Sequence, residues 1–80
     1  MKHAGTETLE KLESLLAMIR ILPGLVERKR GTFYKKSSAF LHFHEDPAGI
    51  FADVKIDGSF QRFSADTPEQ WAKIIKAIKA

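Results

Sequence analysis

Two extended runs joined by a tight turn decide the fold, AFLHFHE at residues 39–45 and IFADVKI at residues 50–56. Both runs are rich in aromatic and β-branched residues, which favour strands. The intervening residues 46–49, DPAG, carry proline and glycine at positions where a turn uses them. A four-residue loop here predicts an antiparallel hairpin with Glu45 opposite Ile50.

The predicted register divides the hairpin into two different faces. Apolar pairs occupy one face: Phe43 with Ala52, and Leu41 with Val54. Polar and aromatic pairs occupy the other: Phe40 with Lys55, His42 with Asp53, and His44 with Phe51. A slip by one residue would bury Asp53 and Lys55, so the hydrophobic pattern fixes the register.

More strands and two helices flank this hairpin. We expect strands at residues 25–27, 32–36 and 60–64, with turns at 28–31, 37–38 and 57–58. A two-residue turn at Ser37 and Ser38 would place Phe33 beside His42. Leucine and isoleucine at helical spacing predict a helix over residues 7–22. The capping box that begins at Thr67 predicts a second helix with Pro68 at its first position.

These elements predict an α+β domain in the order α-β-β-β-β-β-α. Its antiparallel sheet has four or five strands, and an N-terminal and a C-terminal helix pack on one face. The 80 residues form a single small domain (1–80), in which we expect residues 1–5 to be disordered. A chain of this length is marginally stable alone and has no cysteine for a disulfide, so a metal or a homodimer would add stability.

The composition also limits the classes of partner and compartment. The net charge of +3 is only mildly basic. No apolar run approaches the roughly 20 residues that cross a bilayer. The polar start of the chain lacks the apolar core of a signal peptide. We therefore expect a cytoplasmic protein with no membrane partner.

The polar face of the hairpin contains a candidate metal site, formed by His42, His44 and Asp53. Alternate residues of a strand share a face, so the two imidazoles would lie side by side with the carboxylate across the hairpin. Two histidines and a carboxylate suit a divalent metal such as zinc, nickel or iron(II). Two alternatives stay open: His42 and Asp53 form a cross-strand pair that fixes the register, or they act as a catalytic acid–base pair.

The same face is unusually aromatic for a surface that water covers. We expect it to carry Phe33, Phe40 and Phe51, and Arg62 joins it if the last strand has the matching parity. Exposed aromatic patches on small proteins commonly mark interaction surfaces. The leading functional hypothesis is therefore a small binding or interaction module that forms a homodimer through this face.

A third hypothesis concerns the basic turn Arg28, Lys29 and Arg30. These side chains could contact nucleic-acid phosphates while Phe33 or Tyr34 stacks on bases. A run of charges in a turn is more commonly only solvated, so this hypothesis ranks below the other two.

Several of these motifs occur in an order that is similar to a known family. Residues 22–24 (LPG), 31–34 (GTFY) and 42–44 (HFH), followed by Gly49 and Asp53, resemble the small luciferase-like domains of bacteria and fungi. The likeness covers roughly residues 20–63. It implies that His42, His44 and Asp53 are the functional positions, but it implies neither light emission nor a particular reaction. The turn at residues 46–49 is longer than in that pattern, and the chain after Asp53 is shorter.

Overall fold

The computed structural model describes residues 2–80. Three helices and six strands follow one another along the chain: β1 (Lys2–His3), α1 (Thr6–Lys11), α2 (Glu13–Arg20), β2 (Val26–Lys29), β3 (Thr32–Lys35), β4 (Ser38–Asp46), β5 (Gly49–Ile56), β6 (Ser59–Ser64) and α3 (Pro68–Lys79). The predicted α+β class, with helices before and after an antiparallel sheet, is confirmed.

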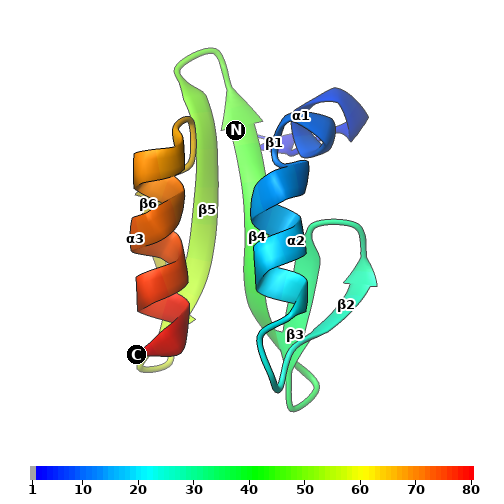
Figure 1. The fold of residues 1–80 in the computed structure, drawn as a ribbon, viewed down its shortest axis with the longest axis vertical. Helices are drawn as coiled ribbons and strands as arrows, with labels where there is room; N and C mark the ends of the chain where they lie inside the picture. The colour runs from blue at the N-terminus through cyan, green and yellow to red at the C-terminus, as the bar shows by residue number, and fades with distance from the viewer. Residues whose placement is uncertain (1) are drawn as a thin grey trace.

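The sheet consists of β2–β6 in chain order, with the short β1 added against β4 (Figure 1). Because β5 occupies the other edge of β4, β1 and β3 lie end to end along one edge. The sequence did not predict β1. Residues 2–5, which we expected to be disordered, instead form this strand and the approach to α1, and residue 1 lies outside the described residues.

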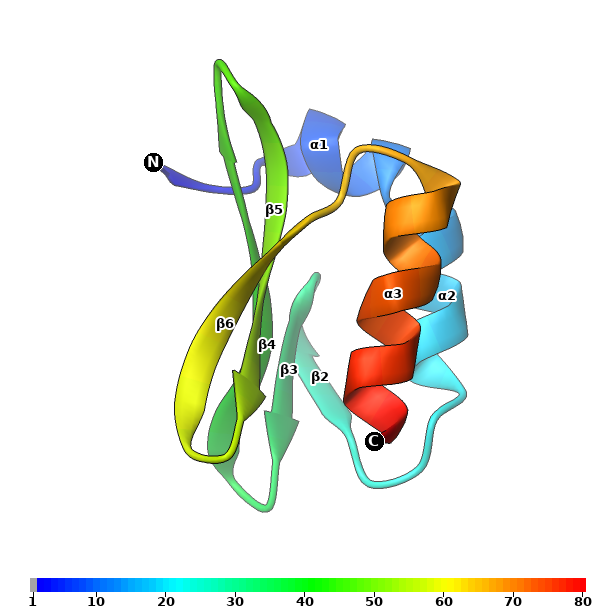
Figure 2. The ribbon, with the colours of Figure 1, turned by 90° about the vertical axis from the view of Figure 1, so that its left-hand side faces the viewer.

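The helices cover one face of the sheet and leave the other bare (Figure 2). α2 and α3 run side by side over the sheet, whereas α1 turns away across its end. The single helix predicted over residues 7–22 is therefore wrong in one respect: the backbone breaks at Leu12, where ψ is 2°. No helix in residues 2–80 is long and apolar enough to cross a membrane.

The central hairpin has the predicted register. His42 pairs with Asp53, His44 with Phe51, and Glu45 with Ile50. The apolar partners on the other face, Leu41, Phe43, Ala52 and Val54, are buried beneath the helices. The predicted capping box of α3 is also present, since the Thr67 side chain accepts a hydrogen bond from the backbone amide of Gln70.

The predicted pairing of β3 with β4 is wrong. The turn lies at Lys36 and Ser37, both with positive φ, rather than at residues 37–38. A bulge follows, because β3 skips Phe40 between its contacts with Ala39 and Leu41.

This shift turns two aromatic side chains away from the outer face. Phe33 pairs with Leu41 and is 1% exposed, and Phe40, the extra residue of the bulge, is 8% exposed. Both belong to the hydrophobic core. Neither can line the binding face to which the sequence assigned it. The physical gain is the burial of two phenyl rings that would otherwise meet water.

Candidate metal centre

Three histidines meet on the bare face of the sheet. His42 and His44 project from alternate positions of β4, as predicted, and β1 places His3 directly opposite His44. The ring centroid of His44 lies 4.6 Å from that of His3 and 4.8 Å from that of His42. One potential ligand atom from each of the three residues lies within 4.8 Å of the other two. The chain has only three histidines, and all of them contribute to this cluster.

His3 is the member that the sequence analysis missed. Its position depends on β1, which is held by a hydrogen bond of 3.0 Å from the Ala4 amide to the Phe43 carbonyl. Lys2 adds an ion pair of 3.7 Å with Glu45. The only sign in the sequence was that His3 is the one remaining histidine of a chain that has three. No local pattern predicts a strand of two residues.

Asp53 lies beneath the imidazoles and is bound by Arg62. It is 6% exposed, and it accepts two hydrogen bonds of 2.8 Å from the Arg62 guanidinium. Its Oδ2 atom lies 3.1 Å from Nδ1 of His44 and 3.9 Å from Nδ1 of His42. Arg62 pairs with Asp53 across β5 and β6, so its side chain lies on the outer face. The sequence alone did not decide on which face of the last strand Arg62 lies. Among the described residues, the three that converge as possible ligands are His3, His42 and His44, and Asp53 as a metal ligand stays a prediction.

Burial and nearby charges shift the pKa values of His42 and Asp53. The two hydrogen bonds from Arg62 lower the pKa of Asp53 despite its burial, so the carboxyl group is an anion at neutral pH. Burial is the main cause that lowers the pKa of His42, and the neighbouring His44 lowers it further. His42 is therefore in the neutral form that binds metals.

Two buried nitrogen atoms in the cluster lack a hydrogen-bond partner within the described part of the chain. They are Nδ1 of His42 and Nδ1 of His44, and the 3.1 Å approach to Asp53 is not aligned as a hydrogen bond. Both atoms lie within 3.9 Å of Oδ2 of Asp53, and Nε2 is the other nitrogen of each ring that a ligand could use. Metal-binding histidines commonly show this arrangement, with one nitrogen on the ion and the other directed at a carboxylate.

The separations also fit an ion after a small adjustment. Tetrahedral zinc bonds of 2.0–2.1 Å place ligand nitrogens about 3.3 Å apart, so the histidine atoms would need to converge by at most about 1.5 Å. His3 is exposed and can supply much of this movement by side-chain rotation. The residues therefore fit a tetrahedral metal with three protein ligands.

Aromatic side chains border the cluster on one side. The Phe60 ring lies 4.9 Å from that of His42 and is 44% exposed. Phe51 lies on the same face, as predicted, with the Arg62 guanidinium 6.0 Å from its ring centre. Without Phe33 and Phe40 this face offers less apolar surface than we expected. The homodimer stays a prediction that sedimentation would test.

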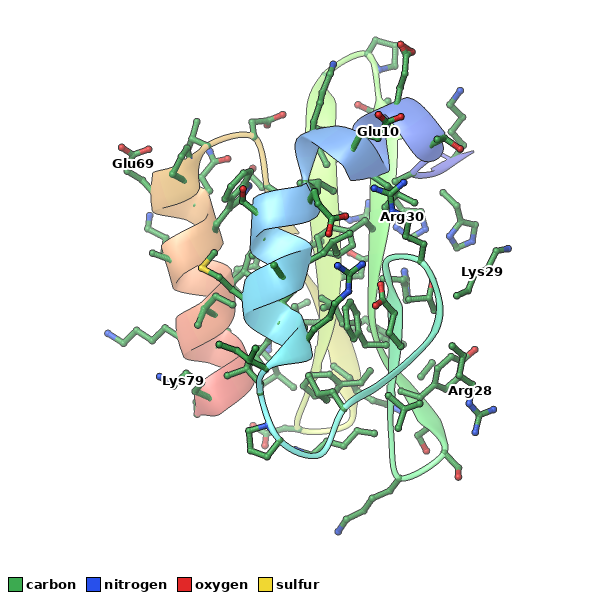
Figure 3. The ribbon with its side chains drawn as sticks, turned by 45° about the vertical axis from the view of Figure 1, so that its right-hand side comes forward. Glu10, Arg28, Lys29, Arg30, Glu69 and Lys79 are labelled. Carbon is green, nitrogen blue, oxygen red and sulfur yellow. The ribbon has the colours of Figure 1, made fainter. Side chains whose placement is uncertain are left out.

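The basic segment at residues 28–30 is largely engaged within the fold. Arg28 lies over the Tyr34 ring at 4.9 Å, and Arg30 forms an ion pair of 3.0 Å with Glu13. Figure 3 shows Arg28 and Lys29 on the outer side of β2, with Arg30 nearer the helices. Only Lys29 of the three has no such partner in residues 2–80, which weakens the argument for nucleic-acid binding.

Comparison with known proteins adds no identification: no family model matches the chain, and no curated protein or solved structure is significantly similar to it. The resemblance to the luciferase-like domains stays a prediction. The functional argument therefore depends on the geometry of the histidine cluster.

Proposed function

We propose that this protein binds a divalent transition-metal ion through His3, His42 and His44. The observation that carries the proposal is the convergence of three imidazoles from two strands, with two buried nitrogens that lack a hydrogen-bond partner and lie beside a carboxylate. Imidazole ligands suit zinc, copper, nickel and cobalt, whereas magnesium and calcium prefer oxygen ligands. Zinc best matches a tetrahedral set of three histidines.

Three protein ligands leave a fourth position on the ion. Structural zinc sites are usually closed by four protein ligands, and sites that bind water or substrate keep one position open. A bound ion would supply Lewis-acid chemistry at that position. Within the protein, Asp53 lies 3.1 Å from Nδ1 of His44, Arg62 holds Asp53 in place, and the Phe60 ring lies 4.9 Å from that of His42.

The acid–base alternative has weaker geometric support. A histidine that acts as a base with an aspartate partner needs a hydrogen bond between them. The distance from His42 Nδ1 to Asp53 Oδ2 is 3.9 Å, and both oxygens of Asp53 are already bound by Arg62. His42 lies opposite Asp53 in the hairpin register, and a role of this pair in fixing the register stays a prediction.

Thermal unfolding with and without metal tests the proposal. Zinc, nickel or cobalt should raise the melting temperature of the wild-type chain, and magnesium and calcium should not, because a ligand that binds only the folded state stabilises it. Cobalt(II) should also give the visible absorption of a tetrahedral complex. Isothermal titration should show one ion per chain.

The His42→Gln variant should lose the zinc-dependent shift, since the amide cannot replace the imidazole. Glu10→Gln serves as a matched control, because Glu10 is an exposed carboxylate on α1, away from the cluster (Figure 3). A shift that survives in His42→Gln, or the absence of any shift with transition metals, would refute the proposal.

A further inference from the structure

Two hollows meet at Phe40, and no histidine lines either of them. The first has a volume of about 330 Å³ and an apolar wall between the end of α3 and the loop after α2, formed by Leu22, Pro23, Leu25 and Ile78. The second has a volume of about 310 Å³ and a basic rim formed by Lys35, Lys36 and Lys55. Phe40 and Lys35 line both hollows, so the two adjoin at these residues.

The bulge in β4 creates this site. A regular strand would direct Phe40 to the same face as His42, but the extra residue turns its ring toward the helix side. β-Bulges commonly redirect a side chain beside a functional site. Here the redirected ring lies between the two hollows, with the Lys35 ammonium 5.2 Å from the ring centre.

Charge is distributed unevenly around the two hollows. Four lysines line them, Lys79 being the fourth, and the lining contains no aspartate or glutamate side chain. Figure 3 shows Lys79 at the C-terminal end of α3. Elsewhere Lys2, Arg20, Arg30 and Arg62 form ion pairs, whereas none of the four lysines does so within residues 2–80. An apolar wall beside unpaired cations is complementary to a molecule with an apolar tail and an anionic head.

We propose that this site binds a soluble single-chain amphiphile with an anionic head group, of the medium-chain carboxylate class. The tail would lie against Leu25 and Ile78, and the head group would meet Lys35 and Lys36 on the other side of Phe40. Each hollow has a volume at the lower end of the range of small-molecule sites. The proposal is independent of the metal centre, because the two sites share no residue.

Nuclear magnetic resonance titration with decanoate below its micelle concentration tests this inference. Amide shifts should change at Leu25, Phe40 and Ile78 and should saturate. Butyrate, which lacks the tail, and decyltrimethylammonium, which carries the opposite charge, should each bind at least about tenfold more weakly. Equal binding of the cationic amphiphile would overturn the proposal, because the lysines would then contribute nothing.

Single lysine substitutions test whether the charge at the rim contributes to binding. Lys35→Gln should weaken decanoate binding about tenfold, since it removes a charge-assisted contact to the head group. Lys36→Gln is a second variant at the same rim. Lys29→Gln makes the same change on β2, away from both hollows, and should leave the affinity unchanged. Unchanged affinity in both rim variants would contradict the proposal.

Two further measurements distinguish the alternatives. His42→Gln should bind decanoate as the wild type does. The proposals for the metal centre and for this site can therefore be refuted independently of each other. Vesicles of anionic phospholipid test a membrane surface as the source of the anionic group. Binding to vesicles without binding to decanoate would overturn the proposal in favour of a membrane contact.

Discussion

His3 and His44 lie directly opposite each other on β1 and β4, with their ring centroids 4.6 Å apart. β1 has only two residues, so few interactions hold it against the sheet. An ion bound between the two strands would connect them through side chains as well as through backbone hydrogen bonds. Metal binding and attachment of β1 are therefore expected to be coupled.

His3→Ala should abolish most of the zinc-dependent rise in melting temperature while changing the metal-free protein little. The side chain of His3 is exposed, so its loss removes little buried surface. Differential scanning calorimetry with zinc and with a chelator would measure both effects. An unchanged zinc effect in His3→Ala would show that β1 contributes no ligand.

Arg62→Ala should lower the free energy of unfolding, because it leaves the Asp53 carboxylate buried without its two hydrogen bonds. Arg62→Lys retains the charge but loses the paired donors, so its effect should be intermediate. Urea unfolding would give the free energies. Arg28→Ala, on the exposed strand β2, is the control and should cost much less.

Gly31→Ala should destabilise the protein more than Gly24→Ala. Both glycines have positive φ, +81° and +85°, so alanine is strained by about 1 kcal/mol at either position. At Gly31 the new Cβ would also lie 2.6 Å from Cδ2 of the buried Leu9, whereas nothing lies within 4 Å at Gly24. We expect a further loss of about 1–3 kcal/mol at Gly31 from overpacking. Equal unfolding free energies would disprove this contact.

Glu27 should contribute to stability at neutral pH and lose that contribution in acid. The Glu27 carboxylate accepts hydrogen bonds from Arg20 and from the Gly31 amide, and the contact with Arg20 is the main cause that lowers its pKa. Because the folded-state pKa lies below the unfolded value of about 4.3, the stabilisation is present above that value and disappears as the pH falls through the folded-state pKa.

Glu27→Gln should therefore be less stable than the wild type by about 1 kcal/mol at pH 7, and the two unfolding free energies should converge as the pH falls below about 4. Urea unfolding across this range would measure the difference. Glu10→Gln should follow the wild-type pH dependence. A difference between Glu27→Gln and wild type that persists in strong acid would exclude the carboxylate charge as its cause.

Local sequence patterns predicted the parts of the fold whose structure depends mainly on residues close together in the chain. The alternation of side chains in residues 39–56 fixed the register of the β4–β5 hairpin, because a slip would bury Asp53 and Lys55. The Thr67 capping box fixed the start of α3. Two of the three histidines, and the face that they share, followed from the same alternation.

The incorrect predictions concern residues whose positions depend on an unusual backbone conformation or on pairing with a distant segment. Lys36 and Ser37 adopt positive φ although neither is glycine or asparagine, so no local residue pattern indicates that the turn begins one residue earlier. The bulge at Phe40 reverses the alternation from which the faces of Phe33 and Phe40 were read. Burial of both rings in the core favours this irregular pairing.

The sequence by itself determined an α+β domain and a hairpin that presents His42, His44 and Asp53 on one face, since these follow from a two-residue period and from turn chemistry. Tertiary structure alone decided that His3 completes the cluster, that Arg62 binds Asp53, and that Phe33 and Phe40 are buried. The reason is that these contacts join segments far apart in the chain, where packing of the whole core rather than local preference selects the partner.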